Sequence, residues 1–267
     1  MDGETLDQTM LALLREVSQR AILPYYRKLA AHEITAKAAD DVVTVADHLA
    51  EDMLAEGLTK IADIPVVGEE AAHADAAVLD RLAGDCWIVD PLDGTRNFAR
   101  GQPPFGILIA RASGGEAQGG WIYDCLSGRF CAARHGHGAF VDGERIAARP
   151  TGETPPVAAI SLIFMDPARR EAVKAAMADY RQVDIPYCAA EQYPRLALGV
   201  NDLSIFERTL AWDHAAGVLW LNEAGGRAAR PDGSPYRVDQ WARKGLLGAA
   251  SPALWDDLAG RLARLES

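Results

Sequence analysis

The spacing of apolar side chains changes along the chain and predicts different elements in its two halves. Apolar residues recur every three to four positions over residues 4–30 and 45–61, and each stretch is predicted to form a helix. Pro24 is expected to interrupt the first helix near its end. The expected inward face of the second helix consists of Leu49, Met53, Leu54, Leu58 and Ile61.

Short apolar runs bounded by turn residues predict the strands of the first half. The runs Ile64–Val67 and Cys86–Val89 have the composition of buried strands, and each is followed closely by acidic residues. Residues 104–148 are predicted to form strands and turns, with Asp142-Gly143 as a two-residue hairpin turn. We therefore expect an α+β first half, residues 1–152.

The second half has a different order of elements. Residues 149–156 are rich in turn formers and poor in apolar side chains, so they form the best candidate boundary. The strands expected after it are 157–164, 203–207 and 245–249, and the helices are 167–180, 190–198, 213–223 and 252–265. Alternating strands and helices predict an α/β second half, residues 153–267.

Composition and charge exclude several classes of protein. The 267 residues include 27 Lys and Arg against 38 Asp and Glu, a net charge of −11, and the basic residues form no cluster that would bind nucleic acid. No apolar run approaches the roughly 20 residues of a membrane helix. Because the acidic N-terminus also lacks a signal-peptide pattern, a cytoplasmic location is expected. The four cysteines show no C-x-x-C spacing and are predicted to be buried free thiols.

The segment from Trp87 to Phe98, WIVDPLDGTRNF, holds the most informative pattern of polar residues. Asp90 and Asp93 follow a buried strand at a spacing of three, and Gly94-Thr95 then opens a short helical turn. Two carboxylates suit a hard cation, and the backbone N–H groups of a helix N-terminus suit a phosphate. Adjacent metal and phosphate sites are what metal-assisted phosphoryl hydrolysis requires. The alternative is an ordinary Asp-Pro and Asp-Gly turn with a helix cap.

Three further acidic residues stand at the ends of predicted elements. Glu69 follows a strand within GEE, Asp47 begins a helix after DVVTVA, and Asp213 begins the helix of WDHAAG. Asp47 and Asp213 could be simple helix N-caps, and Glu69 could be a solvated loop charge. Taken together with the first segment, their common placement favours one acidic site.

With these motifs the sequence resembles the inositol monophosphatase-like, metal-dependent phosphatases. The resemblance rests on WIVDPLDGTRNF (87–98) and WDHAAGVLWLNEAGG (212–226), supported by the GEE and DVVTVAD segments. It implies a layered αβαβα sandwich with the active site between the halves, and a lithium-sensitive homodimer that acts on a small phosphorylated substrate. Some members of this family instead act by binding protein partners, so a regulatory role is also kept.

The resemblance also implies two or three Mg²⁺ ions and a role for each acidic residue. The residues that match first-ion and second-ion ligands are Glu69, Asp90, the backbone carbonyl of Leu92, Asp93 and Asp213, with Asp90 bridging. Asp47 matches an acid that helps to hold a third, weaker ion. Thr95, with Glu69 or Asp47, matches the group that orients a metal-activated water for direct attack. The backbone N–H groups of Gly94 and Thr95 match a phosphate cradle.

The resemblance is weakest where the substrate would be recognised. The family usually has Gly-Ser/Thr-Ala where this chain has Tyr187-Cys188-Ala189, followed by Glu191. Glu207 resembles an acid that contacts a polyol hydroxyl, but it precedes Asp213 by six residues, one fewer than usual. The residues expected to contact substrate are Asp93, Gly94, Thr95, Ala189, Glu207 and Asp213. A small polyol or sugar phosphate is the expected substrate, with histidinol phosphate, another sugar phosphate or a nucleotide as alternatives. His214 is expected to pack rather than to ligate.

Overall fold

The computed structural model describes residues 2–38 and 41–265, and its elements fall into two groups along the chain. The first group is α1 (Gly3–Val17), β1 (Ile34–Ala38), β2 (Asp41–Thr44), α2 (Val45–Ile61), β3 (Val66–Gly68), α3 (Glu69–Ala74), β4 (Cys86–Asp93), α4 (Thr95–Ala99), β5 (Gly106–Ser113), β6 (Glu116–Asp124), β7 (Phe130–Arg134), β8 (Gly138–Val141) and β9 (Glu144–Ile146). The second group is β10 (Val157–Ile160), α5 (Pro167–Ala176), β11 (Arg181–Val183), α6 (Ala189–Ala197), β12 (Leu203–Phe206), α7 (Ala211–Glu223), β13 (Arg227–Ala229), β14 (Leu246–Ala249) and α8 (Pro252–Ala263). Short π or 3₁₀ segments cover Ser18–Ile22, Ala31–Glu33, Ala76–Ala83 and Val238–Gln240.

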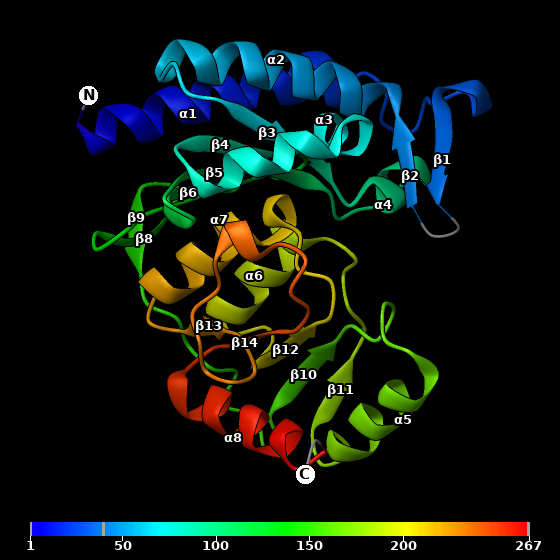
Figure 1. The fold of residues 1–267 in the computed structure, drawn as a ribbon, viewed down its shortest axis with the longest axis vertical. Helices are drawn as coiled ribbons and strands as arrows, with labels where there is room; N and C mark the ends of the chain where they lie inside the picture. The colour runs from blue at the N-terminus through cyan, green and yellow to red at the C-terminus, as the bar shows by residue number, and fades with distance from the viewer. Residues whose placement is uncertain (1, 39–40, 266–267) are drawn as a thin grey trace.

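These elements stack in five layers, as Figure 1 shows from top to bottom. Helices α1 and α2 cover a seven-stranded sheet of order β3-β4-β5-β6-β7-β8-β9, which is antiparallel except for the β3–β4 pair. Helices α6 and α7 form the middle layer. Below them lies a five-stranded sheet of order β11-β10-β12-β14-β13, covered by α5 and α8. The expected mixed α/β class and αβαβα layering are confirmed.

The core consists of three hydrophobic clusters, and the middle one joins the α6 and α7 layer to both sheets. Leu14, Leu54 and Trp121 belong to the cluster between α1, α2 and the large sheet. The cluster beneath that sheet includes Ile122 of β6 and Trp220 of α7, so it draws on both predicted halves. A third cluster lies between the small sheet and the helices α5 and α8. Since the middle core is shared, the division at residues 1–152 and 153–267 stays a prediction.

Helix α7 is buried along almost its whole length because it lies between two sheets. Its contact with β6 requires a glycine, since a Cβ at Gly120 would come within 2.9 Å of the Cα and carbonyl oxygen of Ala216. On another side of α7, a Cβ at Gly217 would come within 2.0 Å of the Tyr193 ring. The absence of a Cβ at Gly120 and at Gly217 therefore allows α7, which carries Asp213, to pack closely against β6 and Tyr193.

Several local predictions are confirmed and two need correction. The α2 bounds agree with the prediction, but Leu49 is 39% exposed, because the face that meets the sheet is formed by side chains four residues apart: Ala46, Ala50, Leu54 and Leu58. The first helix ends at Val17 and passes through a π-helical turn before Pro24, so it is shorter than expected. The Asp142-Gly143 turn joins β8 to β9 with φ of 51° and 85°, as a type I′ turn requires.

Two further results concern the second half and the cysteines. The strand expected over 157–164 ends at Ile160, and the residues after it form a loop beside the cavity described below. All four cysteines are buried and free, as predicted. Among residues 2–38 and 41–265, no helix has the length and apolar character needed to cross a bilayer.

The close approach of β6 and α7 leads to a stability prediction. We expect Gly120→Ala to lower the free energy of unfolding by about 1–3 kcal/mol, because the added methyl group meets backbone atoms that cannot turn away. The measurement is urea unfolding followed by circular dichroism. Gly260→Ala is the matched control, since a Cβ there meets nothing within 4 Å and alanine favours the helix α8. Equal stability of the two variants would contradict this description of the packing.

Candidate active site

The end of β4 forms the centre of the candidate site. Asp90 is 2% exposed, and its Oδ1 accepts a hydrogen bond from the Leu92 backbone N–H at 3.1 Å. Asp93 is the last residue of β4, and its Oδ2 accepts from the Ala190 N–H of α6 at 2.6 Å. Gly94 follows with φ of 85°, where a Cβ would lie 2.8 Å from the Pro104 carbonyl oxygen. Glycine is therefore required where the chain turns from β4 into α4.

Asp47 lies in the first turn of α2 and is held there by a capping box. Thr44 is the N-cap, and its N–H and hydroxyl donate to Asp47 Oδ2 at 2.8 and 2.6 Å. The simple N-cap interpretation of Asp47 is therefore wrong, because Asp47 closes the box from the third helical position. Asp47 Oδ1 faces the hydroxyl of Thr95 at 3.1 Å, and that hydroxyl also donates to the Leu92 carbonyl at 2.8 Å. Asp47 and Thr95 thus form a pair that spans 48 positions of the chain.

Glu69 begins α3 and is positioned by a residue that sequence reasoning missed. The carboxylate of Glu51 accepts hydrogen bonds from the N–H groups of Glu70 and Ala71, each at 2.8 Å. A Cβ at Gly68 would lie 2.3 Å from the Glu51 carboxyl carbon, so the chain passes directly over this group. The sequence signal for Glu51 was its position on the buried side of α2, where a charged residue is unusual.

Asp213 lies in the first turn of α7, whose N-cap is Leu210, so its N-cap interpretation is also wrong. Its Oδ2 lies 3.7 Å from Nη2 of Arg208. The neighbouring His214 is buried, and its Nε2 lies 3.0 Å from the Arg208 carbonyl oxygen, which can only accept. Nε2 therefore carries the proton, and Nδ1 accepts from the Tyr193 hydroxyl at 2.8 Å. Burial lowers the His214 pKa to about 3, so the ring is neutral and packs as expected.

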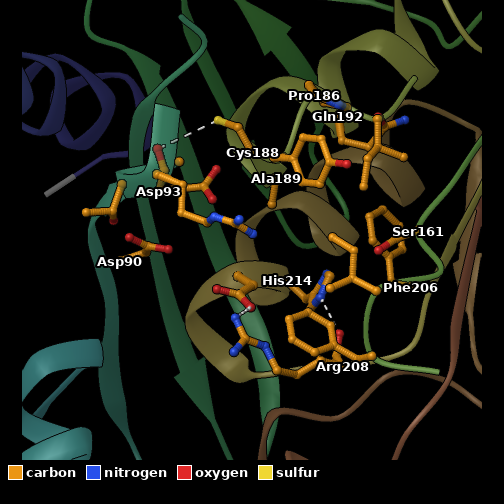
Figure 2. Close-up of a pocket in the computed structure, with 18 of the residues that line it drawn as sticks. Asp90, Asp93, Ser161, Pro186, Cys188, Ala189, Gln192, Phe206, Arg208 and His214 are labelled. Carbon is orange, nitrogen blue, oxygen red and sulfur yellow. Dashed lines mark hydrogen bonds and ion pairs between the residues drawn. The ribbon is translucent and has the colours of Figure 1, made fainter. Parts of the chain in front are cut away.

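These segments meet around one cavity of about 180 Å³ (Figure 2). Nine of the ten predicted site residues line it: Glu69, Asp90, Leu92, Asp93, Gly94, Thr95, Ala189, Glu207 and Asp213. The tenth, Asp47, does not line the cavity and contacts Thr95. The structure thus brings together the predicted residues, while the role of each stays a prediction.

The electrostatics of the cavity are dominated by buried carboxylates. Burial raises the Asp90 pKa well above its ordinary range, and the negative charges of Glu69, Asp93, Asp213 and Asp47 raise it further. Burial also raises the Asp93 pKa to about 6, although hydrogen bonds from Cys188 and Ala190 oppose the shift. For Asp47, burial raises the pKa to about 6 against the hydrogen bonds from Thr44. A positive charge in this cavity would relieve all three shifts.

The donor set fits a hard divalent cation such as Mg²⁺. Carboxylate oxygens and the Leu92 carbonyl are the ligand types that this ion prefers. Within the described ranges, no three His, Cys, Asp or Glu side chains are already grouped closely enough to hold an ion. Asp213 pairs with Arg208 at 3.7 Å, so one of these carboxylates is partly neutralised by a side chain of the protein.

Two of the residues that depart from the family pattern are engaged by other side chains. Glu207 pairs with Arg169 at 3.5 Å, and Glu191 lies between Arg129 and Arg195 at 2.7 and 2.8 Å. Glu191 therefore belongs to an ion-pair network beside the cavity. A further residue that sequence reasoning missed is Asn97, whose Nδ2 donates to the Pro104 and Pro186 carbonyl oxygens, each at 2.9 Å. Its only signal was its place within WIVDPLDGTRNF.

Comparison with known proteins agrees with this architecture. The model of the inositol monophosphatase family matches residues 2–265. Human inositol monophosphatase 2 is 32% identical over 211 residues, which cover 75% of this chain and 72% of the human protein. The inositol-1-monophosphatase of Bacillus subtilis is 33% identical over 177 residues, 64% of this chain, and the match spans just under two thirds (65%) of that protein's length. The crystal structure of the extragenic suppressor protein suhB from Bartonella henselae superimposes with a TM-score of 0.81, covering 97% of this chain and 98% of the other at 24% identity, which shows the fold.

The raised pKa of Asp47 predicts how stability depends on pH without metal. Because the folded pKa of about 6 exceeds the ordinary 3.8, the folded state binds more protons than the unfolded state between these values. Its contribution to stability is therefore full below about pH 4 and is lost as the pH rises through 6. Asp47→Asn cannot ionise, so we expect it to avoid this loss. The variant should therefore become more stable relative to the wild type as the pH rises from 4 to 7.

The measurement is urea unfolding in EDTA at several pH values. Asp52→Asn, at an exposed position of α2, is the control and should keep the wild-type profile. A stability difference for Asp47→Asn that does not change with pH would show that this carboxyl titrates normally.

Proposed function

This chain belongs to the inositol monophosphatase family and is a phosphoric monoester hydrolase, and from this membership we propose that it hydrolyses a small polyol or sugar phosphate with Mg²⁺. The observation that carries the proposal is the meeting of Glu69, Asp90, Asp93 and Asp213 around one cavity, with the Thr95 hydroxyl among them. A metal ion requires oxygen ligands, and a phosphate requires N–H donors. The carboxylates and the turn at Gly94-Thr95 would supply these two kinds of group side by side.

The acidic residues would hold the ions, with Asp90 shared between two sites and Asp47 helping with a third. Mg²⁺ supplies a Lewis acid that neutralises charge on the phosphate, makes a water molecule more acidic and stabilises the leaving alkoxide. The Leu92 carbonyl and the carboxylates of Glu69 and Asp213 would complete the ligand set. The Gly94 and Thr95 backbone N–H groups would orient the phosphate.

Thr95 and Asp47 would orient the attacking water. The Thr95 hydroxyl donates to the Leu92 carbonyl and faces Asp47, so its lone pairs can accept a hydrogen bond from water. The buried Asp47 carboxylate accepts only, so it holds the single proton of that hydroxyl on the side away from the water. Burial raises the pKa of Cys188, the cysteine that lines the cavity, well above its ordinary value, so it stays a thiol. The chain thus favours direct transfer of the phosphoryl group to water.

The same family membership supports three further proposals. We infer that the protein acts as a cytoplasmic homodimer and that lithium inhibits it. Activity measured in LiCl, against NaCl at equal ionic strength, tests the last of these. Hydrolysis of a phosphomonoester by the purified chain would also separate an enzymatic role from a purely regulatory one.

The proposal predicts that Asp93→Asn abolishes turnover. Replacing a charged ligand with a neutral one should lower kcat roughly 10³-fold or more, because the ion loses part of its charge-balancing set. The measurement is phosphate release from a panel of phosphomonoesters with Mg²⁺, and with EDTA as the metal-free reference. Asp52→Asn controls for charge removal at an exposed site. Near-normal kcat of Asp93→Asn in saturating Mg²⁺ would rule out this assignment.

A second prediction separates the hydroxyl of Thr95 from its backbone. We expect Thr95→Ala to lower kcat about 10²-fold with little change in KM, because the N–H donors to the phosphate remain. Thr95→Ser keeps the hydroxyl and should retain most of the activity. If Thr95→Ala instead raises KM alone, Thr95 contacts the bound phosphate and does not orient water.

A further inference from the structure

The cavity continues beyond the acidic residues into a region of different chemistry. Figure 2 shows Asp90 and Asp93 on one side of it and Ser161, Phe206 and Gln192 on the other. Ile163 and Ile185 also line the cavity, so part of its lining is apolar. A phosphate held at the acidic end would direct the rest of the substrate toward this region.

Two exposed aromatic rings line the same cavity. Phe164 is 42% exposed and Tyr187 is 53% exposed, and they are two of the six large apolar side chains exposed among the described residues. Exposed aromatic rings that line a cavity offer flat surfaces on which another ring can stack. The Arg208 guanidinium lies over one face of the Phe164 ring, 4.4 Å from the ring centre, so a planar ligand would stack on the opposite face.

The backbone holds Tyr187 in an unfavourable conformation. Its φ of 52° is in the left-handed region, which residues with a Cβ rarely adopt. Both neighbours are fixed, because the Pro186 carbonyl accepts from Asn97 and the Cys188 thiol donates to the Asp93 carbonyl at 3.7 Å. Strain of this kind often marks functional positions, and here the same contacts tie the tyrosine to the acidic site.

Gln192 leaves one polar atom without a partner in the same cavity. It is 3% exposed, and its Nε2 donates to Ser204 Oγ at 2.6 Å. Its Oε1 has no hydrogen-bond partner within residues 2–38 and 41–265. If the amide is turned over, Nε2 becomes the unpaired atom instead. Since an unpaired buried polar atom is unfavourable, a ligand atom that bonds it would be favoured.

The groups expected to bind a polyol hydroxyl are engaged elsewhere or missing. Glu207 pairs with Arg169, and Cys188 stands where the resemblance implies a hydroxyl side chain. We propose that the substrate carries, away from its phosphate, a flat nitrogen-containing ring that stacks on Phe164 and Tyr187 and bonds Gln192 through its edge. This inference rests on the proposed hydrolysis of a phosphomonoester at that site, and it replaces the plain polyol of that proposal with an ester that carries a ring.

The test compares phosphomonoesters with and without the ring. Adenosine 5′-monophosphate is paired with ribose 5-phosphate, and histidinol phosphate is paired with leucinol phosphate, so a large and a small ring are distinguished. We expect at least one ring ester to have a kcat/KM about tenfold above its ring-free partner, from the usual strength of stacking on an aromatic side chain. Tyr187→Ala and Phe164→Ala should reduce this ratio toward one, while kcat/KM for the ring-free ester changes less than about twofold.

The control variants separate stacking from general damage. Tyr187→Phe keeps the ring and should keep the ratio, and Leu126→Ala removes an exposed apolar side chain that does not line the cavity. Gln192→Met should lower the ratio through KM. A wild-type ratio near one for both pairs, or a raised ratio that survives both alanine variants, would overturn the proposal.

A binding measurement keeps this result separate from the proposed function. Calorimetric titration of each ester in Ca²⁺ reports affinity without turnover. If no ester is hydrolysed in Mg²⁺, the proposed function fails, yet tighter binding of a ring ester that depends on Tyr187 would still support the ring site. Equal affinities within both pairs would overturn it.

Discussion

The whole arrangement depends on holding several carboxylates near one another inside the protein. Asp90 is buried at the end of β4, and the charges of four other acids raise its pKa. Such a group is unfavourable unless a cation binds or protons are taken up. The three hydrophobic clusters of the fold must offset this unfavourable free energy. The acidic site therefore destabilises the protein locally, and the packing of the layers compensates for it.

Hydrogen bonds with backbone N–H groups hold several segments of the acidic site in place. A capping box fixes Asp47, the Glu51 carboxylate fixes the start of α3 beside Glu69, and the Leu92 N–H bonds Asp90. The position of α7 depends on the missing side chains at Gly120 and Gly217, which let the helix approach β6 and Tyr193. The termini of secondary-structure elements thus place the acidic residues around the cavity.

The two ends of the cavity come from different parts of the sandwich. The acidic end is built mainly from β4 and the helix starts that surround it, whereas the loops after β10 and before α6 supply the apolar end. Loops tolerate change more readily than buried strands do. This explains how the chain can keep the family's acidic motifs and yet carry Tyr187 and Cys188 where the resemblance implies small and hydroxyl residues.

Local patterns in the sequence determined the elements and the chemistry of the acidic site. Helical periodicity was enough for α2, the Asp142-Gly143 pair for its hairpin turn, and acids at strand and helix ends for the location of Asp90 and Asp213. The tertiary structure alone decided which side chains pair across long stretches of chain. It pairs Glu207 with Arg169, exposes Leu49 and leaves one atom of Gln192 without a partner among residues 2–38 and 41–265. Periodicity reports the environment of a residue along its own element, whereas these contacts depend on how distant elements are placed against one another, which no local pattern records.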